Sequence, residues 1–490
     1  MLKNFISDEL AKRMAGIPEE IIEESKQLRK EIGTLQYTLR YNEIYSNNRS
    51  EDFIINNILE KLRCYEDFIS KLEKDFPKYA ELKKNKNHIS IHQIQDMLEP
   101  SQAFLEYQFT FNAFFLFYID KDTVQLIYKP ISRDFPETVL KYRAFFENMK
   151  YGDFSEQLII NYARQSYELY KLTLKPVEHL IKNKRLLIVA DGELNLIPFE
   201  TLVTENIDSI DVRYTFSDLP YLINTNSISY LYSASQLTDN KEPLKGRPHY
   251  AGFSPEYNNT MNRPDPDSLY TYLGVLPGAY EEVMSAKKYF KGTVYTGKKA
   301  SKNKFFKASL KNDIVHLAMH TLLDNREPMN SKLLFSSNFK EYGEQLHAYE
   351  VYSREIGASM MVLSACNTGS GKLTKGEGVF SIARAFLLAG VKNVIITQWS
   401  VADKSSASIM DRYYYYLSEG YPVDIALQKS KADFLKKGDP VKAHPYYWAG
   451  YVSIGNPIYF ATKSNRWISV LITSIALLFA VFWIKRKLRF

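Results

Sequence analysis

The chain reads Met360-Met361-Val362-Leu363-Ser364-Ala365-Cys366-Asn367-Thr368-Gly369 at the place that decides its fold. The hydrophobic run predicts a buried strand, and the polar residues and glycine after it predict a turn. A free cysteine is often only a small buried hydrophobe. Cys366, however, stands where the strand stops, which favours a position on the rim of a sheet.

A second hydrophobic run, residues 314–320, ends in His320, which lies 46 positions before Cys366 (366 − 320). Parallel strands of an α/β sheet present the residues at their carboxyl ends along one crevice. Two such strand ends place a thiol beside a base, the minimum apparatus for covalent acyl transfer. The sequence therefore predicts a Cys366–His320 catalytic pair.

Strands and helices alternate through residues 246–462, which predicts a mostly parallel sheet covered on both faces. We expect strands at 250–253, 293–295, 314–318, 360–364 and 394–397, and helices near 279–289, 301–310, 378–389, 404–418 and 422–436. Residues 100–245 form another α/β half without an evident nucleophile. Its expected strands are 103–109, 113–119, 124–128 and 184–190, and its expected helices are near 136–149 and 156–182.

Residues 1–99 are expected to be helical. Apolar residues recur there at helical spacing in two runs, Leu28 to Leu39 and Ile55 to Leu72, with a polar turn at residues 47–50 between them. Such seams predict two amphipathic helices packed as an antiparallel pair.

Composition excludes several classes of protein. Hydrophobic residues make up 45% of the 490 residues, which is typical of a folded chain. The net charge is +7, of which six charges follow residue 462, so residues 1–462 carry about +1 (7 − 6). A near-neutral body argues against a nucleic-acid surface. Two cysteines, Cys64 and Cys366, exclude a disulfide framework.

The residues from Trp467 to Ile484 contain 18 uncharged, mainly apolar positions with tryptophan near both ends and basic residues on both flanks. This pattern predicts one membrane-spanning helix, followed by a basic tail at 485–490, and hence a single-pass protein with a C-terminal anchor. Residues 1–15 do not resemble a signal peptide.

Two observations point to opposite sides of the membrane for the folded body, residues 1–462. The tail carries four basic residues and the leading flank two, which favours a cytoplasmic tail and an external body. The lack of an export signal favours a cytoplasmic, tail-anchored body instead.

His316 and Asp403 have two interpretations each. His316 lies four residues before His320 on the same strand, so a shared metal is conceivable, but no further ligand has metal-like spacing. A core or supporting role for His316 is preferred. Asp403 suits the N-cap of helix 404–418, and equally an anion in a specificity pocket that receives Arg or Lys.

Several motifs together resemble the CHAT peptidase domain, a bacterial relative of caspases, gingipain-type proteases and separase. The matching segments are Leu276-Pro277-Gly278-Ala279, residues 316–320, residues 328–333, residues 363–369, Gly376-Glu377-Gly378, Ala383-Arg384-Ala385-Phe386, Trp399-Ser400-Val401-Ala402-Asp403 and residues 446–451. The resemblance spans roughly residues 100–460, and such domains usually follow tetratricopeptide repeats, of which residues 1–99 would be a remnant.

The resemblance implies a caspase-like three-layer αβα fold, an inactive N-terminal half and a catalytic half at 246–462. It also implies a cysteine endopeptidase with Cys366 and His320 as its dyad, regulated by a protein partner and needing no metal or organic cofactor. The oxyanion would face the backbone N–H groups of Cys366 and Thr321. Many relatives have glycine at the latter position, where threonine keeps the donor but restricts the backbone.

Two other functions share these features. The first is an inactive scaffold that holds protein partners at the membrane. The second is an acyl transferase or amidase that acts on small molecules through the same dyad. The reactivity of Cys366 and the best substrate distinguish the three.

Overall fold

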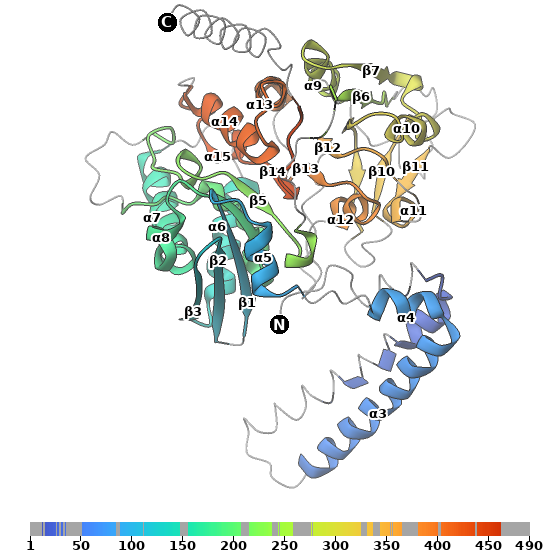
Figure 1. Ribbon diagram of the computed structural model, residues 1–490. Coiled ribbons are helices and arrows are strands. Elements are labelled where there is room, and N and C mark those ends of the chain that lie inside the picture. The colour runs from blue at the N-terminus through green and yellow to red at the C-terminus, as the bar shows by residue number, and fades with distance from the viewer. Residues whose placement is uncertain are drawn as a thin grey trace, which may run out of the picture. The chain divides into compact units, whose positions relative to one another are not determined.

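The structure is a computed structural model of the 490-residue chain (Figure 1). It describes residues 12, 15–25, 27–28, 31–32, 35, 51–84, 89–110, 112–147, 155–206, 215–237, 244, 246–257, 276, 278–324, 331–336, 344–352, 354, 356–364, 381–399, 403–436 and 439–461. The chain divides into two compact units, residues 1–90 with 232–236, and residues 91–231 with 237–490.

The first unit contains helices α3 (Glu51–Asp75) and α4 (Pro77–Lys84). Proline lacks a backbone N–H and is favoured in the first turn of a helix, which suits the start of α4 at Pro77. A small core forms from Ile17, Ile22, Ile69, Leu72 and Tyr79. The second expected helix is therefore α3, and most of the first expected seam lies outside the described residues.

The second unit is built on one sheet of 11 strands, in the order β3-β2-β1-β4-β5-β14-β13-β12-β8-β6-β7. The strands are β1 (Gln102–Phe109), β2 (Ala113–Asp120), β3 (Val124–Pro130), β4 (Arg185–Val189), β5 (Ile228–Tyr230), β6 (His249–Ser254), β7 (Lys291–Thr296), β8 (Ile314–Ala318), β12 (Met360–Ser364), β13 (Asn393–Thr397) and β14 (Tyr451–Gly455). Only β2 with its two neighbours, and β14 with β13, pair antiparallel. The prediction of a mixed α/β fold with a mostly parallel sheet is confirmed.

The N-terminal α/β part also contains α5 (Ile91–Met97), α6 (Phe135–Glu147), α7 (Glu156–Thr173) and α8 (Glu178–Ile181). The expected helical stretch 156–182 is divided into α7 and α8 by a short 3-10 turn at Lys175–Val177. Pro176 sits in that turn, where its ring and missing N–H prevent the α7 ladder from continuing.

Helices of the C-terminal part are α9 (Ala279–Ser285), α10 (Lys302–Ser309), α11 (Ala348–Tyr352), α12 (Ser381–Leu388), α13 (Asp403–Ser418), α14 (Val423–Lys436) and α15 (Pro445–Trp448). A second, three-stranded sheet of β9 (Thr321–Leu322), β10 (Lys332–Leu334) and β11 (Gln345–His347) was not expected from the sequence. Its strands have two or three residues, too few to show a period.

Helices cover both faces of the C-terminal part of the large sheet. On one face Ala318 packs with Ala279 and Val283 of α9. On the other, Phe253 of β6 contacts Phe305 of α10 with ring centroids 6.0 Å apart. Successive residues of a strand point to opposite faces, and Phe253 pairs with Leu317, the neighbour of Ala318. The layers are therefore helix, sheet and helix.

A glycine in β6 lets α9 approach the sheet closely. A Cβ atom on Gly252 would lie 2.9 Å from the Cβ atom of Val283 and 2.7 Å from the hydroxyl of Tyr250. That hydroxyl donates to the backbone carbonyl of Val283 at 2.9 Å. The same helix carries the buried Glu282.

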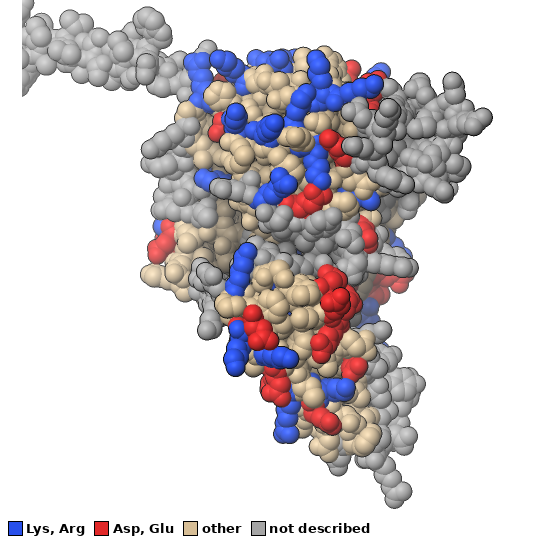
Figure 2. All heavy atoms as spheres, turned by 90° about the vertical axis from the view of Figure 1, so that its right-hand side faces the viewer, with Lys and Arg blue, Asp and Glu red and all other residues tan. Residues whose placement is uncertain are grey.

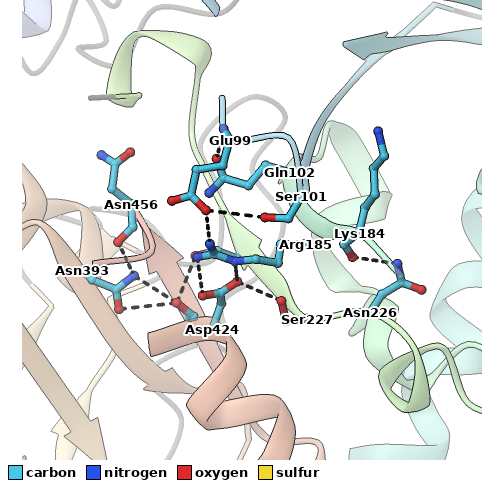
Figure 3. Close-up of polar contacts among 12 residues, drawn as sticks. Glu99, Ser101, Gln102, Lys184, Arg185, Asn226, Ser227, Asn393, Asp424 and Asn456 are labelled. Carbon is cyan, nitrogen blue, oxygen red and sulfur yellow. Dashed lines mark hydrogen bonds and ion pairs between the residues drawn. The ribbon is translucent and has the colours of Figure 1, made fainter. Parts of the chain in front are cut away.

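A buried ion pair ties β4 to α14 (Figure 3). Arg185 donates to both carboxylate oxygens of Asp424 at 2.9 Å and to Glu99 at 2.8 Å. Ser227 donates to the same Asp424 carboxylate at 2.8 Å. Because charges buried in a protein require hydrogen-bonded partners, this arrangement connects the two α/β parts of the unit.

No helix among the described residues is both long enough and apolar enough to cross a bilayer. The segment 467–484, for which we predict a membrane helix, lies outside those residues.

Candidate functional site

The expected catalytic strands are neighbours in the large sheet. β8 and β12 pair in parallel from Ile314 with Met360 to Ala318 with Ser364, a constant offset of 46 residues (364 − 318). His320 follows β8 by two positions. Cys366 follows β12 by the same number and lies outside the described residues.

Tyr257 fixes the main chain and the ring of His320. The His320 backbone N–H donates to the Tyr257 hydroxyl at 3.0 Å, and this hydroxyl donates to the carbonyl of Leu334 at 2.6 Å. The aromatic ring of Tyr257 lies against the imidazole, with centroids 4.7 Å apart. The carbonyl of His320 accepts from the Leu334 N–H at 3.0 Å. Both backbone groups of His320 are thereby occupied.

Thr321 begins β9 and pairs with Leu333 of the antiparallel strand β10. In such a pair of strands, hydrogen-bonded and non-hydrogen-bonded residue pairs alternate. His320 and Leu334 form a hydrogen-bonded pair, in which the Leu334 N–H donates directly to the His320 carbonyl and the Tyr257 hydroxyl links the His320 N–H to the Leu334 carbonyl. The next pair, Thr321 and Leu333, is therefore of the non-hydrogen-bonded type. The Thr321 N–H therefore points away from β10. The Thr321 hydroxyl is buried and has no hydrogen-bond partner in the described part of the chain.

His316 is fully buried in the middle of β8. Its Nδ1 lies 2.9 Å from the Tyr414 hydroxyl, and its Nε2 lies 3.6 Å from a carboxylate oxygen of Glu282. Within the described ranges no three His, Cys, Asp or Glu side chains converge as a metal site requires. His316 therefore belongs to a buried polar cluster with Tyr414 and Glu282.

The cluster extends to the end of β12. Tyr451 of β14 contacts Glu282 at 3.3 Å, Ser364 at 2.6 Å and the Ser406 hydroxyl. Burial raises the pKa of Tyr451, so its hydroxyl stays protonated at neutral pH. A continuous chain of polar contacts thus runs from His316 through Glu282 and Tyr451 to Ser364, two residues before Cys366.

The segment that leads to Asp403 is held by the N-terminal α/β part. Arg143 of α6 donates to the backbone carbonyl of Gln398 at 2.7 Å, and its guanidinium lies 4.9 Å above the ring of Trp399. Phe146 stacks on the same ring with centroids 5.1 Å apart. α13 begins at Asp403, as expected within one residue, but the side chain of Asp403 is outside the description.

Residues 163–456 match the CHAT domain, which is more than half of the chain. The chain belongs to the CHAT domain family.

Known relatives of this CHAT domain protein include tetratricopeptide repeat protein 28 from Homo sapiens and Mus musculus. They are 24% and 22% identical to it over 340 residues, which is 61% of this chain and 13% of each relative. The chain thus spans about an eighth of their length. Among solved structures, the Saccharomyces cerevisiae separase–securin complex matches with a TM-score of 0.43 and 11% identity, over 81% of this chain and 32% of that one.

Sequence reasoning about the CHAT domain located two described candidates, His320 and Thr321, at one sheet edge, while His316 lies within the cluster beneath. It missed Tyr257, Glu282 and Tyr451. Tyr257 lies 63 positions before His320, Glu282 lies 34 positions before His316 (316 − 282), and Tyr451 lies 87 positions after Ser364, so no local spacing could have indicated them.

Proposed function

We propose that this CHAT protein is a membrane-anchored cysteine endopeptidase with Cys366 as nucleophile and His320 as general acid and base. The supporting observation is the register of β8 and β12. Its offset of 46 residues equals the separation of His320 and Cys366, so a continued register would place these two residues side by side. Neighbouring strands are about 4.8 Å apart, within reach of a thiol and an imidazole.

In the proposed reaction the Cys366 thiolate attacks the carbonyl carbon of the peptide, forming a C–S bond while the carbonyl electron pair moves to oxygen. Protonated His320 gives its proton to the leaving amine as the C–N bond breaks. Neutral His320 then takes a proton from water, whose oxygen attacks the carbonyl carbon of the thioester; the C–S bond breaks, Cys366 leaves as thiolate, and the second product is released as a carboxylic acid.

The oxyanion would accept hydrogen bonds from the backbone N–H groups of Thr321 and Cys366. The orientation of the Thr321 N–H away from β10 supports this role. Threonine in place of glycine is compatible with it, because the donor belongs to the backbone. A donor of this kind contributes roughly 100- to 1,000-fold to the rate of acyl transfer.

Asp403 would bind an Arg or Lys side chain of the substrate just before the scissile bond. Arg143 anchors Gln398 and Trp399, the described residues that precede Asp403 on the way from β13, and this anchoring supports the proposal. The helical region, residues 1–99, would bind a regulatory protein partner. Residues 467–484 would anchor the chain in a lipid bilayer, and either side of the membrane is compatible with this proposal.

The test is cleavage of peptides that carry Arg, Lys, Asp or Leu before the scissile bond, using the full chain in detergent micelles. Cys366→Ala should abolish turnover, whereas Cys64→Ala, a change at the exposed cysteine of α3, should leave it intact. Asp403→Ala should mainly remove the preference for basic residues. Full turnover by Cys366→Ala would reject the enzyme.

A thiol-reactive probe distinguishes the enzyme from an inactive scaffold. In the enzyme Cys366 should react faster than Cys64, and His320→Ala should slow that reaction, since an imidazole partner stabilises the thiolate. Equal, slow labelling would favour the scaffold. A small amide or acyl donor as the best substrate would instead identify an amidase or acyl transferase.

A further inference from the structure

The amino-terminal edge of the catalytic part of the sheet carries a basic surface. We define this basic edge by six exposed residues that precede or begin its strands, namely Arg247, Lys287, Lys288, Lys291, Lys311 and Lys392. The sequence between Ala286 and Asn312 contains nine lysines and no Asp or Glu. Figure 2 shows Lys and Arg gathered on the upper part of the face that it presents.

Acidic neighbours reduce the charge of the basic edge without cancelling it. Asp411 pairs with Lys288 at 2.6 Å, and Asp313 lies 3.9 Å from the ring of His249. Glu419 lines the same cavity as Lys291. In the described part of the chain, no ion pair involves the other five cations of the edge. Six cations against three anions leave a clear positive excess.

The last described residues of the chain lie at this edge. A cavity of about 900 Å³ is lined by Arg247, Lys288 and Lys291 together with Phe460 and Ala461, the last described residues. The Ala461 N–H donates to Leu244, shortly before β6, at 3.3 Å. Only five residues, Thr462 to Arg466, separate Ala461 from Trp467. Six peptide steps span at most about 20 Å.

We propose that the basic edge docks on anionic phospholipid headgroups of the membrane that holds residues 467–484. This inference rests on the proposed membrane anchor. A short tether keeps the edge near the bilayer at high effective concentration, and lysines near an anionic leaflet are attracted within about a Debye length. His320 lies at the carboxyl end of β8, the opposite edge of the sheet, so docking would direct the catalytic crevice away from the lipid.

The test measures acetylation of individual lysines by mass spectrometry in the full chain, reconstituted in phosphatidylcholine vesicles with or without roughly 30% phosphatidylserine. Lys287, Lys291 and Lys311 should react at least about fivefold more slowly in the anionic vesicles. Lys298 and Lys299, which follow the other end of β7, should react equally in both. Salt at about 0.5 M should remove the difference.

Charge reversal provides the matched comparison. Lys287→Glu with Lys291→Glu should abolish the protection of Lys311 and Lys392, whereas Lys298→Glu with Lys299→Glu, an equal change of charge, should preserve it. Protection by inorganic phosphate in phosphatidylcholine vesicles would overturn docking in favour of a small-anion site.

Alkaline extraction separates the two ways in which the proposal can fail. A chain that resists extraction but shows no lipid-dependent protection would retain the anchor and refute the docking surface. A chain that is extracted would refute the anchor and, with it, the docking.

Discussion

The hydroxyl of Tyr257 bridges the strand end that carries His320, accepting from the His320 N–H at 3.0 Å and donating to Leu334 at 2.6 Å. A direct hydrogen bond from the His320 N–H to the Leu334 carbonyl would be expected here, but the Tyr257 hydroxyl lies between the two groups and bonds to both. The position of the imidazole thus depends on one phenol.

Tyr257→Phe should lower kcat/KM for a peptide substrate about tenfold, because the His320 N–H and the Leu334 carbonyl lose their shared partner while the ring contact remains. Tyr295→Phe is the control, since that ring stacks on Phe253 with centroids 4.7 Å apart and its hydroxyl bonds to no described residue. Steady-state kinetics of the full chain measures both, and an unchanged rate in Tyr257→Phe would show that the bridge does not position the base.

Thr321→Pro should reduce kcat roughly 100- to 1,000-fold, because it removes the backbone donor proposed for the oxyanion. Proline is tolerated at a sheet edge whose N–H faces outward, as that of Thr321 does. Thr321→Val is the control, because it also lacks the hydroxyl but keeps the N–H. If both variants keep the activity of the natural chain, the Thr321 N–H is not the oxyanion donor. If both lose activity to the same extent, the loss comes from the missing hydroxyl.

The sequence was most informative where apolar runs are long. Strands β8 and β12 have the predicted bounds, 314–318 and 360–364, because each is an apolar run of five residues with a single polar member, His316 in β8 and Ser364 at the end of β12. The sequence does not show that these two strands are neighbours; their parallel pairing, with an offset of 46 residues equal to the separation of His320 and Cys366, is seen only in the structure.

Other features could not be predicted from local patterns. β9, β10 and β11 owe their strand conformation to one another, and β5 has only three residues. The Glu282–Tyr451 contact joins residues 169 positions apart. Glu282 is buried on α9. From the sequence alone it looks like an ordinary acidic residue in the first turn of a helix, where a negative charge is favoured.

Tyr451→Phe should destabilise the chain by about 3 kcal/mol, because Ser364, Ser406 and the Glu282 carboxylate all lose a partner inside the core. Tyr413→Phe is matched in burial, but among the described residues the Tyr413 hydroxyl bonds only to the sulfur of Met360, at 3.3 Å. It should cost less than about 1 kcal/mol. Urea unfolding in micelles measures both changes. Equal unfolding midpoints for the two variants would show that the hydrogen bonds of the Tyr451 hydroxyl do not stabilise the folded chain.

Asp424→Asn should destabilise the chain by about 3–5 kcal/mol, because the buried Arg185 guanidinium loses its bidentate anion and retains only Glu99. The control is Asp439→Asn, which removes an exposed carboxylate paired with Lys442 and should leave the urea midpoint unchanged. A small effect of Asp424→Asn would mean that water or Glu99 compensates the arginine.

His444 should make the chain sensitive to acid. Burial lowers the pKa of His444 from 6.5 to about 4. Its Nδ1 accepts the Tyr446 N–H at 3.1 Å at the start of α15, a bond that only an unprotonated Nδ1 can accept. Between pH 6.5 and 4 the unfolded chain binds a proton that the folded chain does not, so stability falls as pH falls, by up to about 3 kcal/mol.

The matched variant is His444→Asn, because asparagine caps helices well and does not titrate. Its urea midpoint should decline less steeply than that of the natural chain between pH 6.5 and 4.5, and the two curves should run parallel above pH 7, where the imidazole is neutral in both folded and unfolded chains. Parallel curves throughout this range would show that His444 takes up its proton as readily in the folded protein as in the unfolded one.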